Sequence, residues 1–193
     1  MSRTVLLIRH GTHDEVGRVR SGRSDIGLNA EGVRQAERLA QWLDTVPIDT
    51  LHASPRRRAR ETALPLAKRR SLPIVEAAAF DEIDFGAFTG RSFAALARDP
   101  DWHIWNAQRD TAQCPGGEGM AAMLERARAC RDALPAGTSA IVTHCDVIRG
   151  LVADVLGVPM RGIFAFDCDP CSITTLADSD GRWRLLSLNE QPR

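Results

Sequence analysis

Val5-Leu6-Leu7-Ile8-Arg9-His10-Gly11-Thr12, close to the start of the chain, contains the pattern from which we predict the fold. Its four apolar residues predict a short strand that is buried on both faces, as in a parallel sheet. The polarity then changes at once to an arginine, a histidine and a glycine. Ligands of open α/β sheets bind beyond the carboxyl ends of the strands, so we expect a binding site here. Gly11 lacks a Cβ, which lets another group approach the backbone closely.

The size and charge of the chain narrow the class of protein. A length of 193 residues fits one domain, residues 1–193, that buries a core without disulfide bonds. The 25 basic and 25 acidic residues balance, so no long-range field indicates nucleic acid or an anionic membrane as a partner. The sequence contains no apolar run of membrane-spanning length and no secretory signal pattern, and its five cysteines are an odd number. We therefore expect a soluble, cytoplasmic protein with reduced thiols.

Strand and helix patterns alternate along the chain. Asn29 is the expected N-cap of a first helix, in which Val33, Ala36, Leu39, Ala40 and Leu43 face the sheet. We expect further helices from Ser54-Pro55, with the proline at N1, to Arg70, and over 120–134 and 147–156. Short helical turns are expected over 93–105, and strands over 5–8, 49–53, 72–75, 140–143, 172–177 and 182–188. This order predicts a three-layer α/β/α sandwich with a mainly parallel sheet, to which the last hairpin adds an antiparallel edge.

Three further segments carry groups of polar residues at fixed spacing. They read SPRRRARETA at 54–63, FDEIDFGAFTG at 80–90 and IVTHCDVIR at 141–149. With Arg9-His10-Gly11 they follow the order of motifs in the histidine phosphatase (phosphoglycerate mutase-like) superfamily, which the chain resembles from Val5 to about Arg149. The resemblance implies a phosphomonoester phosphatase that acts on a small phosphorylated metabolite, without a cofactor and without a metal ion.

The resemblance makes His10 the nucleophile. A neutral imidazole nitrogen can attack phosphorus and form a phosphohistidine, which divides one difficult transfer into two easier ones. Arg9, Arg58 and His144 then bind the phosphoryl oxygens, and nearby guanidinium groups keep His10 unprotonated. We expect the remaining arginines of the second segment, Arg57 and Arg60, to lie on a solvated helix face; Arg56 stays undecided.

Glu82 is the expected general acid, because the leaving oxygen needs a proton and a partly buried glutamate beside a phosphate can hold one. Asp81 and Asp84 are the alternatives for this role. Thr89 stands where the family has a second glutamate.

The segment between the first strand and the first helix resembles the substrate loop of the family, in which Ser21 and Gly22 match a Ser/Thr-Gly pair that contacts the substrate. Cys145 occupies a substrate-site position where the family usually has glycine, and its β-carbon narrows the pocket. We expect this cysteine to pack rather than to act as a catalytic thiol. His13 is expected to be a loop or substrate-side residue, since this part of the chain departs from the family pattern.

Two other functions fit the same motifs. A phosphoglycerate mutase would return the phosphoryl group to its substrate, and a regulatory domain would bind phosphate without turnover. The mutase is disfavoured because the chain is short and reads Glu82-Ile83-Asp84-Phe85-Gly86 where mutases have Glu-Arg-His-Tyr-Gly. The regulatory domain is disfavoured because nucleophile, phosphate clamp and acid are all present. The sequence indicates neither the identity of the substrate nor the oligomeric state.

Overall fold

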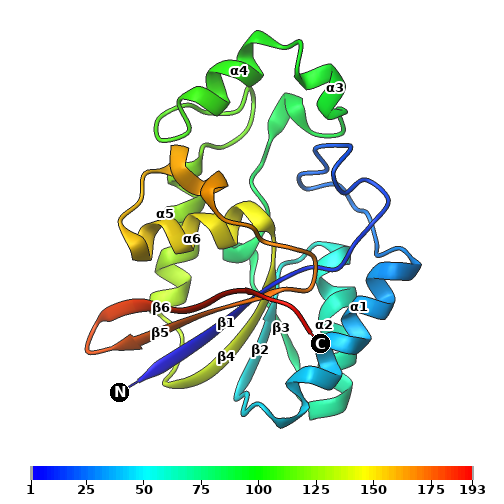
Figure 1. Ribbon diagram of the computed structural model, residues 1–193, viewed down its shortest axis with the longest axis vertical. Helices are drawn as coiled ribbons and strands as arrows, with labels where there is room; N and C mark the ends of the chain where they lie inside the picture. Colours follow the sequence, from blue (N-terminus) through cyan, green and yellow to red (C-terminus); the bar gives the residue numbers. More distant parts are fainter. Residues whose placement is uncertain (1, 193) are drawn as a thin grey trace.

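The computed structural model describes residues 2–192, which form one six-stranded sheet with helices on both faces (Figure 1). The strand order is β3-β2-β4-β1-β5-β6, and β1 (Arg3–Arg9) lies near the centre. β1 pairs in parallel with β4 (Gly137–Thr143), beyond which β2 (Thr50–Ala53) and β3 (Ile74–Glu76) continue the parallel part. On its other side β1 pairs antiparallel with β5 (Ile173–Ser179), which forms a hairpin with β6 (Arg182–Glu190). The predicted mainly parallel sandwich with an antiparallel edge is confirmed.

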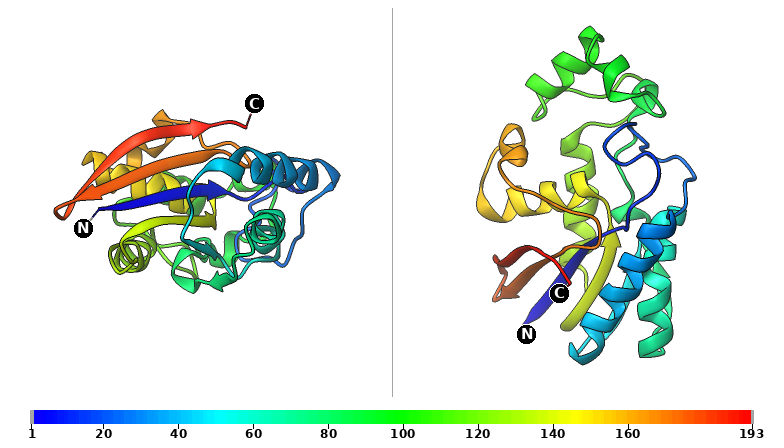
Figure 2. Two further views of the ribbon diagram at one scale, coloured as in Figure 1. Left: turned by 90° about the horizontal axis from the view of Figure 1, so that it is seen from below. Right: turned by 45° about the vertical axis from the view of Figure 1, so that its right-hand side comes forward.

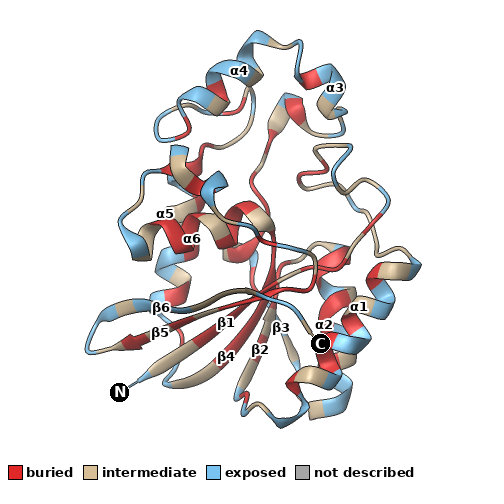
Figure 3. Cartoon of the chain, in the orientation of Figure 1, coloured by how far each residue is buried: buried red, intermediate tan, exposed pale blue. Residues whose placement is uncertain are grey.

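Two hydrophobic cores lie on opposite faces of the sheet. One contains Leu6 and Ile8 of β1 and packs under α1 (Ala30–Trp42) and α2 (Arg57–Arg70). The other contains Val5 and Leu7 and packs under α5 (Met120–Asp132) and α6 (Cys145–Leu156). Successive residues of a strand point to opposite faces, so the continuous apolar run of β1 fills both cores. Figure 3 shows the resulting band of buried strands.

A cap built from the segment between β3 and α5 extends beyond the carboxyl ends of the parallel strands (Figure 1). It contains α3 (Phe93–Leu96), α4 (Pro100–Ala107) and the short helices η2 (Ala78–Phe80) and η3 (Gly86–Phe88). The cap is held together by edge-on and stacked aromatic rings, among them Phe88, Trp102 and Trp105. The two remaining short helices are η1 (Leu43–Thr45) and η4 (Met160–Ala165).

The loop between β1 and α1 runs alongside this cap (Figure 2, right). Val19 forms an isolated antiparallel bridge with Ser92, and the Arg20 amide donates to the carbonyl of Arg91 at 2.9 Å. Loop and cap together border the carboxyl ends of β1 and β4, where the sequence predicts a site.

Three sequence predictions need correction in detail. α2 begins at Arg57 rather than at Pro55, because the Ser54 hydroxyl bonds to the side chains of Asp81 and His144 and caps no helix. α6 begins at Cys145, two residues earlier than predicted. Val33 is 50% exposed, whereas Gly32 of the same helix is buried against the loop after β1.

The group that approaches Gly11 closely is the backbone of Gly32 at the start of α1. A β-carbon on Gly11 would lie 2.8 Å from the Gly32 carbonyl oxygen, and one on Gly32 would lie 2.1 Å from the Thr12 carbonyl oxygen. Both distances are shorter than van der Waals contact, so two glycines let the start of α1 pack directly on the loop that follows β1. Within residues 2–192, no helix is long and apolar enough to cross a bilayer.

Candidate active site

The parallel register of β1 and β4 brings two histidines together. Arg9 is paired with Thr143 at the ends of these strands, and the His10 amide donates to the Thr143 carbonyl at 3.0 Å. His10 and His144, the next residues, therefore lie side by side, with ring centroids 5.2 Å apart. This places the first and fourth motifs of the sequence at one point on the sheet edge.

His10 is held as a neutral imidazole with one unprotonated nitrogen. Its Nδ1 lies 2.8 Å from the Gly11 carbonyl oxygen, which can only accept, so Nδ1 carries the proton. Nε2 keeps its lone pair and accepts from Arg58 Nε at 3.3 Å. Burial lowers the pKa of His10 well below its ordinary value of 6.5, and the guanidinium groups of Arg58 and Arg9 lower it further. The unprotonated Nε2 is the form that a nucleophile needs.

Arg58 is buried in the first turn of α2, where its guanidinium group joins three parts of the site. In addition to His10 it donates through Nη2 to the Gly22 carbonyl at 2.6 Å and to His144 Nδ1 at 3.2 Å. Gly22 has a φ of +51°, and a β-carbon there would lie 2.9 Å from the Thr89 hydroxyl oxygen. Gly22 is thus required by the backbone and also fixes Arg58, a role that the sequence did not indicate.

The other arginines of this segment differ in exposure. Arg57 and Arg60 have half-exposed side chains on the outer face of α2, as predicted. Arg56, left undecided from the sequence, points inward: its Nε lies 3.0 Å from Asp81 Oδ1, and its Nη1 donates to the Arg23 carbonyl at 2.7 Å.

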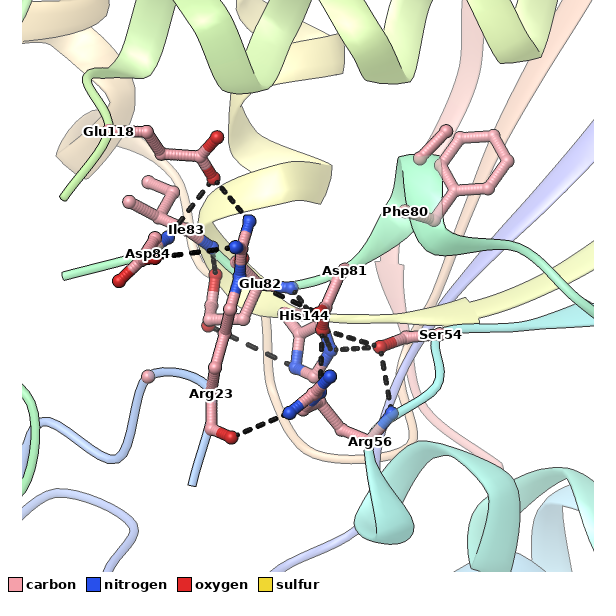
Figure 4. Close-up of polar contacts among 12 residues, drawn as sticks. Arg23, Ser54, Arg56, Phe80, Asp81, Glu82, Ile83, Asp84, Glu118 and His144 are labelled. Carbon is pink, nitrogen blue, oxygen red and sulfur yellow. Dashed lines mark hydrogen bonds and ion pairs between the residues drawn. The ribbon is translucent and has the colours of Figure 1, made fainter. Parts of the chain in front are cut away.

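His144 is fully buried and belongs to a hydrogen-bonded chain (Figure 4). Ser54 Oγ donates to Asp81 Oδ1 at 3.0 Å, so it accepts the proton of His144 Nε2 at 2.7 Å. Nδ1 is then the acceptor from Arg58, and burial together with Arg58 lowers the pKa of His144 well below 6.5. Donation to a phosphoryl oxygen, the role that the resemblance implies, requires that His144 take up a proton at Nδ1 when the anion binds.

The three candidate carboxyl groups lie in different environments (Figure 4). Asp81 accepts from Ser54 and from the Glu82 amide and pairs with Arg56. Asp84 has a side chain that is 44% exposed and pairs with Arg23 at 3.4 Å. Glu82 is buried, with Oε1 accepting from the Ile83 amide at 3.0 Å and Oε2 4.0 Å from His144 Nδ1.

The environment of Glu82 favours its protonated form. Burial raises the pKa of Glu82 to about 8, and the nearby Asp146 carboxylate adds to this increase against the opposing effect of Arg58. The carboxyl group therefore carries a proton at neutral pH, the state that a general acid requires.

A cavity of about 90 Å³ opens at this point. It is lined by six of the predicted residues, namely Arg9, His10, Ser21, Gly22, Glu82 and Cys145. Arg58 and His144 do not line it; Arg58 contacts both His10 and His144. Arg20 and Phe93, which the sequence did not single out, are also in its wall, as is His13, whose ring centroid is 5.3 Å from that of His10. Burial, with Arg58 and Arg9, lowers the pKa of His13 to about 4.

Arg9 and Cys145 meet at the carbonyl of Cys168. Arg9 Nη1 donates to this oxygen at 2.5 Å, and Cys145 Sγ lies 3.9 Å from it. Interaction with the Cys168 side chain lowers the pKa of the Cys145 thiol to about 7. Since Cys145 is the first residue of α6 and lines the cavity, its side chain takes up space that a glycine would leave open.

Comparison with known proteins agrees with this fold. The chain belongs to the histidine phosphatase superfamily (branch 1), whose family model matches residues 5–191. Phosphoserine phosphatase 1 of Hydrogenobacter thermophilus is 27% identical over 193 residues, covering 96% of this chain and 91% of the relative. The probable phosphoglycerate mutase GpmB of Yersinia enterocolitica is 29% identical over 188 residues, covering 93% of this chain and 86% of the relative.

Solved structures extend the comparison. The native structure of mycobacterial glucosyl-3-phosphoglycerate phosphatase Rv2419c matches with a TM-score of 0.89 and 26% identity, covering 99% of this chain and 100% of that chain. The structure of the same protein with inorganic phosphate matches with a TM-score of 0.86 and 25% identity, covering 98% of this chain and 98% of that chain. The structure with VO3 matches with a TM-score of 0.87 and 28% identity, covering 98% of this chain and 100% of that chain. These relatives support phosphatase activity on small phosphorylated metabolites, that of a phosphoric monoester hydrolase.

Proposed function

We propose that residues 1–193 act as a single domain that hydrolyses the phosphomonoester of a small metabolite through a phosphohistidine on His10. One observation carries the proposal: His10 and Glu82 line the same small cavity, where burial lowers the pKa of the histidine and raises that of the glutamate. A nucleophile and an acid with pKa values displaced in opposite directions are what a two-step phosphoryl transfer needs.

In the first step, His10 Nε2 forms a bond to phosphorus while the bond between phosphorus and the ester oxygen breaks. Glu82 gives its proton to that oxygen, so that an alcohol leaves rather than an alkoxide. Arg9 and Arg58 balance the charge on the phosphoryl oxygens, which is the dominant contribution of a protein to this reaction. The Gly11 carbonyl accepts from Nδ1 and stabilises the positive charge that the ring gains.

In the second step, a water molecule attacks the phosphohistidine. The Glu82 carboxylate takes a proton from this water as the phosphorus–nitrogen bond breaks, which restores neutral His10 and protonated Glu82. Hydrolysis is favoured over the mutase reaction because residues 82–86 read Glu-Ile-Asp-Phe-Gly and lack the arginine and histidine of the mutase segment, so that water reaches the phosphohistidine.

Substitution of Glu82 with glutamine tests the acid. We expect kcat/KM for an alkyl phosphate to fall about 10²- to 10⁴-fold, the usual contribution of general acid catalysis, while kcat/KM for p-nitrophenyl phosphate falls much less because its leaving group needs no proton. In the unmodified enzyme, kcat/KM for the alkyl ester should decline as the pH rises through about 8, where Glu82 loses its proton. The low-pH limit set by His10 should lie well below pH 6.5.

Asp84→Asn is the matched control, because Asp84 is a nearby carboxyl group held in an exposed ion pair. It should keep both the alkyl-phosphate activity and the decline near pH 8. A loss that is equal for the two esters in Glu82→Gln, or a loss confined to Asp84→Asn, would assign the acid elsewhere.

The reaction is expected to be independent of metal ions. Among residues 2–192, no three His, Cys, Asp or Glu side chains gather as metal ligands, and the arginines supply the charge that metal-dependent phosphatases take from ions. Phosphate release should therefore continue at an unchanged rate in EDTA, whereas vanadate, which mimics five-coordinate phosphorus, should inhibit it. Activity that disappears with EDTA and returns with Mg²⁺ would contradict this mechanism.

A further inference from the structure

Arg20 lines the cavity but has no part in the chemistry described above. Its guanidinium carbon lies 4.5 Å from the ring centre of Phe85, 5.1 Å from that of Phe93 and 5.2 Å from that of Trp102. Its backbone is paired with the cap through the Arg91 carbonyl and the Gly90 amide, both at 2.9 Å. Aromatic faces and backbone hydrogen bonds therefore hold this cation in one position on the cavity wall.

The charge around Arg20 is incompletely balanced. Arg20 Nη1 donates to Asp146 Oδ2 at 3.0 Å, and Arg109 Nη1 lies 3.9 Å from the other oxygen of the same carboxylate. Burial alone would raise the pKa of Asp146, but Arg20, Arg109, Arg149 and Arg9 together lower it. One buried carboxylate thus faces four guanidinium groups, and the Nε atom of each of these arginines is buried without a hydrogen-bond partner.

A phosphate ester would not satisfy all of this charge. Its phosphoryl group lies next to Arg9 and His10, whereas the Glu82 carboxyl group on the same wall has a pKa raised to about 8 and adds little negative charge at neutral pH. Arg20 shares its carboxylate partner, Asp146, with Arg109, so a second anion that reaches Arg20 would gain a strong, charge-assisted interaction.

Building on the proposed function, we propose that Arg20 determines specificity by binding a carboxylate of the substrate close to the phosphate ester. The preferred substrates are then phosphorylated hydroxy acids or amino acids. A carboxylate fits better than a second phosphoryl group because the cavity of about 90 Å³ is small and a carboxylate is the smaller anion. The small volume of the cavity also requires that the carboxylate be only a few bonds from the ester oxygen.

Two esters that differ at this group test the proposal. Phosphoglycolate carries the carboxylate, and 2-hydroxyethyl phosphate carries a hydroxymethyl group in its place. We expect kcat/KM of the unmodified enzyme to be about ten- to a hundredfold higher for phosphoglycolate, the range expected for a charge-assisted hydrogen bond. In Arg20→Met this ratio should fall to within about threefold of one, since the interaction is lost.

Arg18→Met is the control, because Arg18 is an exposed arginine of the same loop that donates to the Asp14 carbonyl and does not line the cavity. It should keep the preference of the unmodified enzyme. Arg20→Lys, which keeps the charge but not the planar donor edge, should give an intermediate ratio, and it replaces Arg20→Met if the latter does not fold.

The two proposals fail in different ways. If the unmodified enzyme releases phosphate from neither ester nor from p-nitrophenyl phosphate, the phosphatase function is wrong. If it hydrolyses phosphoglycolate and 2-hydroxyethyl phosphate equally well, or if both Arg20 variants keep the preference for phosphoglycolate, the assignment of Arg20 is overturned and the phosphatase function is unaffected.

Discussion

His10→Ala is expected to lower kcat for phosphomonoester hydrolysis by about 10⁴-fold or more, because removal of a nucleophile removes the covalent path itself. His10 Nε2 is the buried imidazole nitrogen that a guanidinium group orients and keeps unprotonated. Among the described residues that line the cavity, no other imidazole accepts a hydrogen bond from a guanidinium group. Release of inorganic phosphate from p-nitrophenyl phosphate measures the loss, and nitrophenol leaves from this substrate without a proton from Glu82.

Two controls accompany this variant. His103→Ala removes an exposed imidazole of the cap and should leave kcat unchanged. His13→Ala removes the imidazole next to His10 and should cost much less than His10→Ala. Retention of more than about a hundredth of the activity by a folded His10→Ala protein, with a large loss in His13→Ala, would move the nucleophile to His13.

Arg58→Met is expected to reduce kcat/KM by about 10²- to 10³-fold, the effect seen when one donor to a developing oxyanion is removed. The structure gives a further reason for a large loss. The same guanidinium group donates to His10, His144 and the Gly22 carbonyl, so its removal also releases the nucleophile and the substrate loop. Steady-state kinetics on one ester, with circular dichroism to verify folding, measures the effect.

Arg60→Met is the matched control, since Arg60 is an arginine of the same helix with an exposed side chain, and it should change kcat/KM by less than about twofold. Arg58→Lys keeps the charge but cannot make three directed hydrogen bonds, so we expect an intermediate loss. Equal activity of Arg58→Met and Arg60→Met would show that Arg58 has no part in the reaction.

Much of the fold could be predicted because its strands carry strong local patterns. The apolar runs of β1 and β4 each end in a histidine, and parallel strands that are neighbours place such ends together. The cap helices over 93–105 and the final hairpin were also predicted, the hairpin from Asp178-Ser179-Asp180-Gly181, of which Asp180 and Gly181 adopt positive φ in the turn.

The parts that the sequence did not indicate depend on contacts between distant segments. Ser54-Pro55 has the local signature of a helix start, but the Ser54 hydroxyl bonds to His144, 90 residues away, and the helix begins later. Arg18, Arg20 and Arg23 alternate with other residues in one loop and look equivalent in sequence. Only the fold distinguishes them: Arg18 is exposed, Arg20 lines the cavity, and Arg23 pairs with acidic residues of the cap segment.

The carboxyl groups illustrate the same limit. Asp81, Glu82 and Asp84 are separated by at most three positions, so the sequence predicts Glu82 as the acid but leaves the two aspartates as alternatives. Asp81 contacts an arginine and a serine, Glu82 lies in the buried cavity wall, and Asp84 forms a half-exposed ion pair. These environments are built by segments far along the chain.

The central claim, a phosphohistidine on His10 that is hydrolysed by water, is tested most directly by trapping the intermediate. The enzyme is mixed briefly with p-nitrophenyl phosphate, quenched in alkali and digested, and mass spectrometry locates the phosphoryl group. We predict a base-stable, acid-labile phosphoryl group on His10, which disappears as inorganic phosphate accumulates after the substrate is exhausted. A phosphoryl group on His13 or Cys145, or turnover without any trapped phosphoryl group while nitrophenol shows a pre-steady-state burst, would contradict the account.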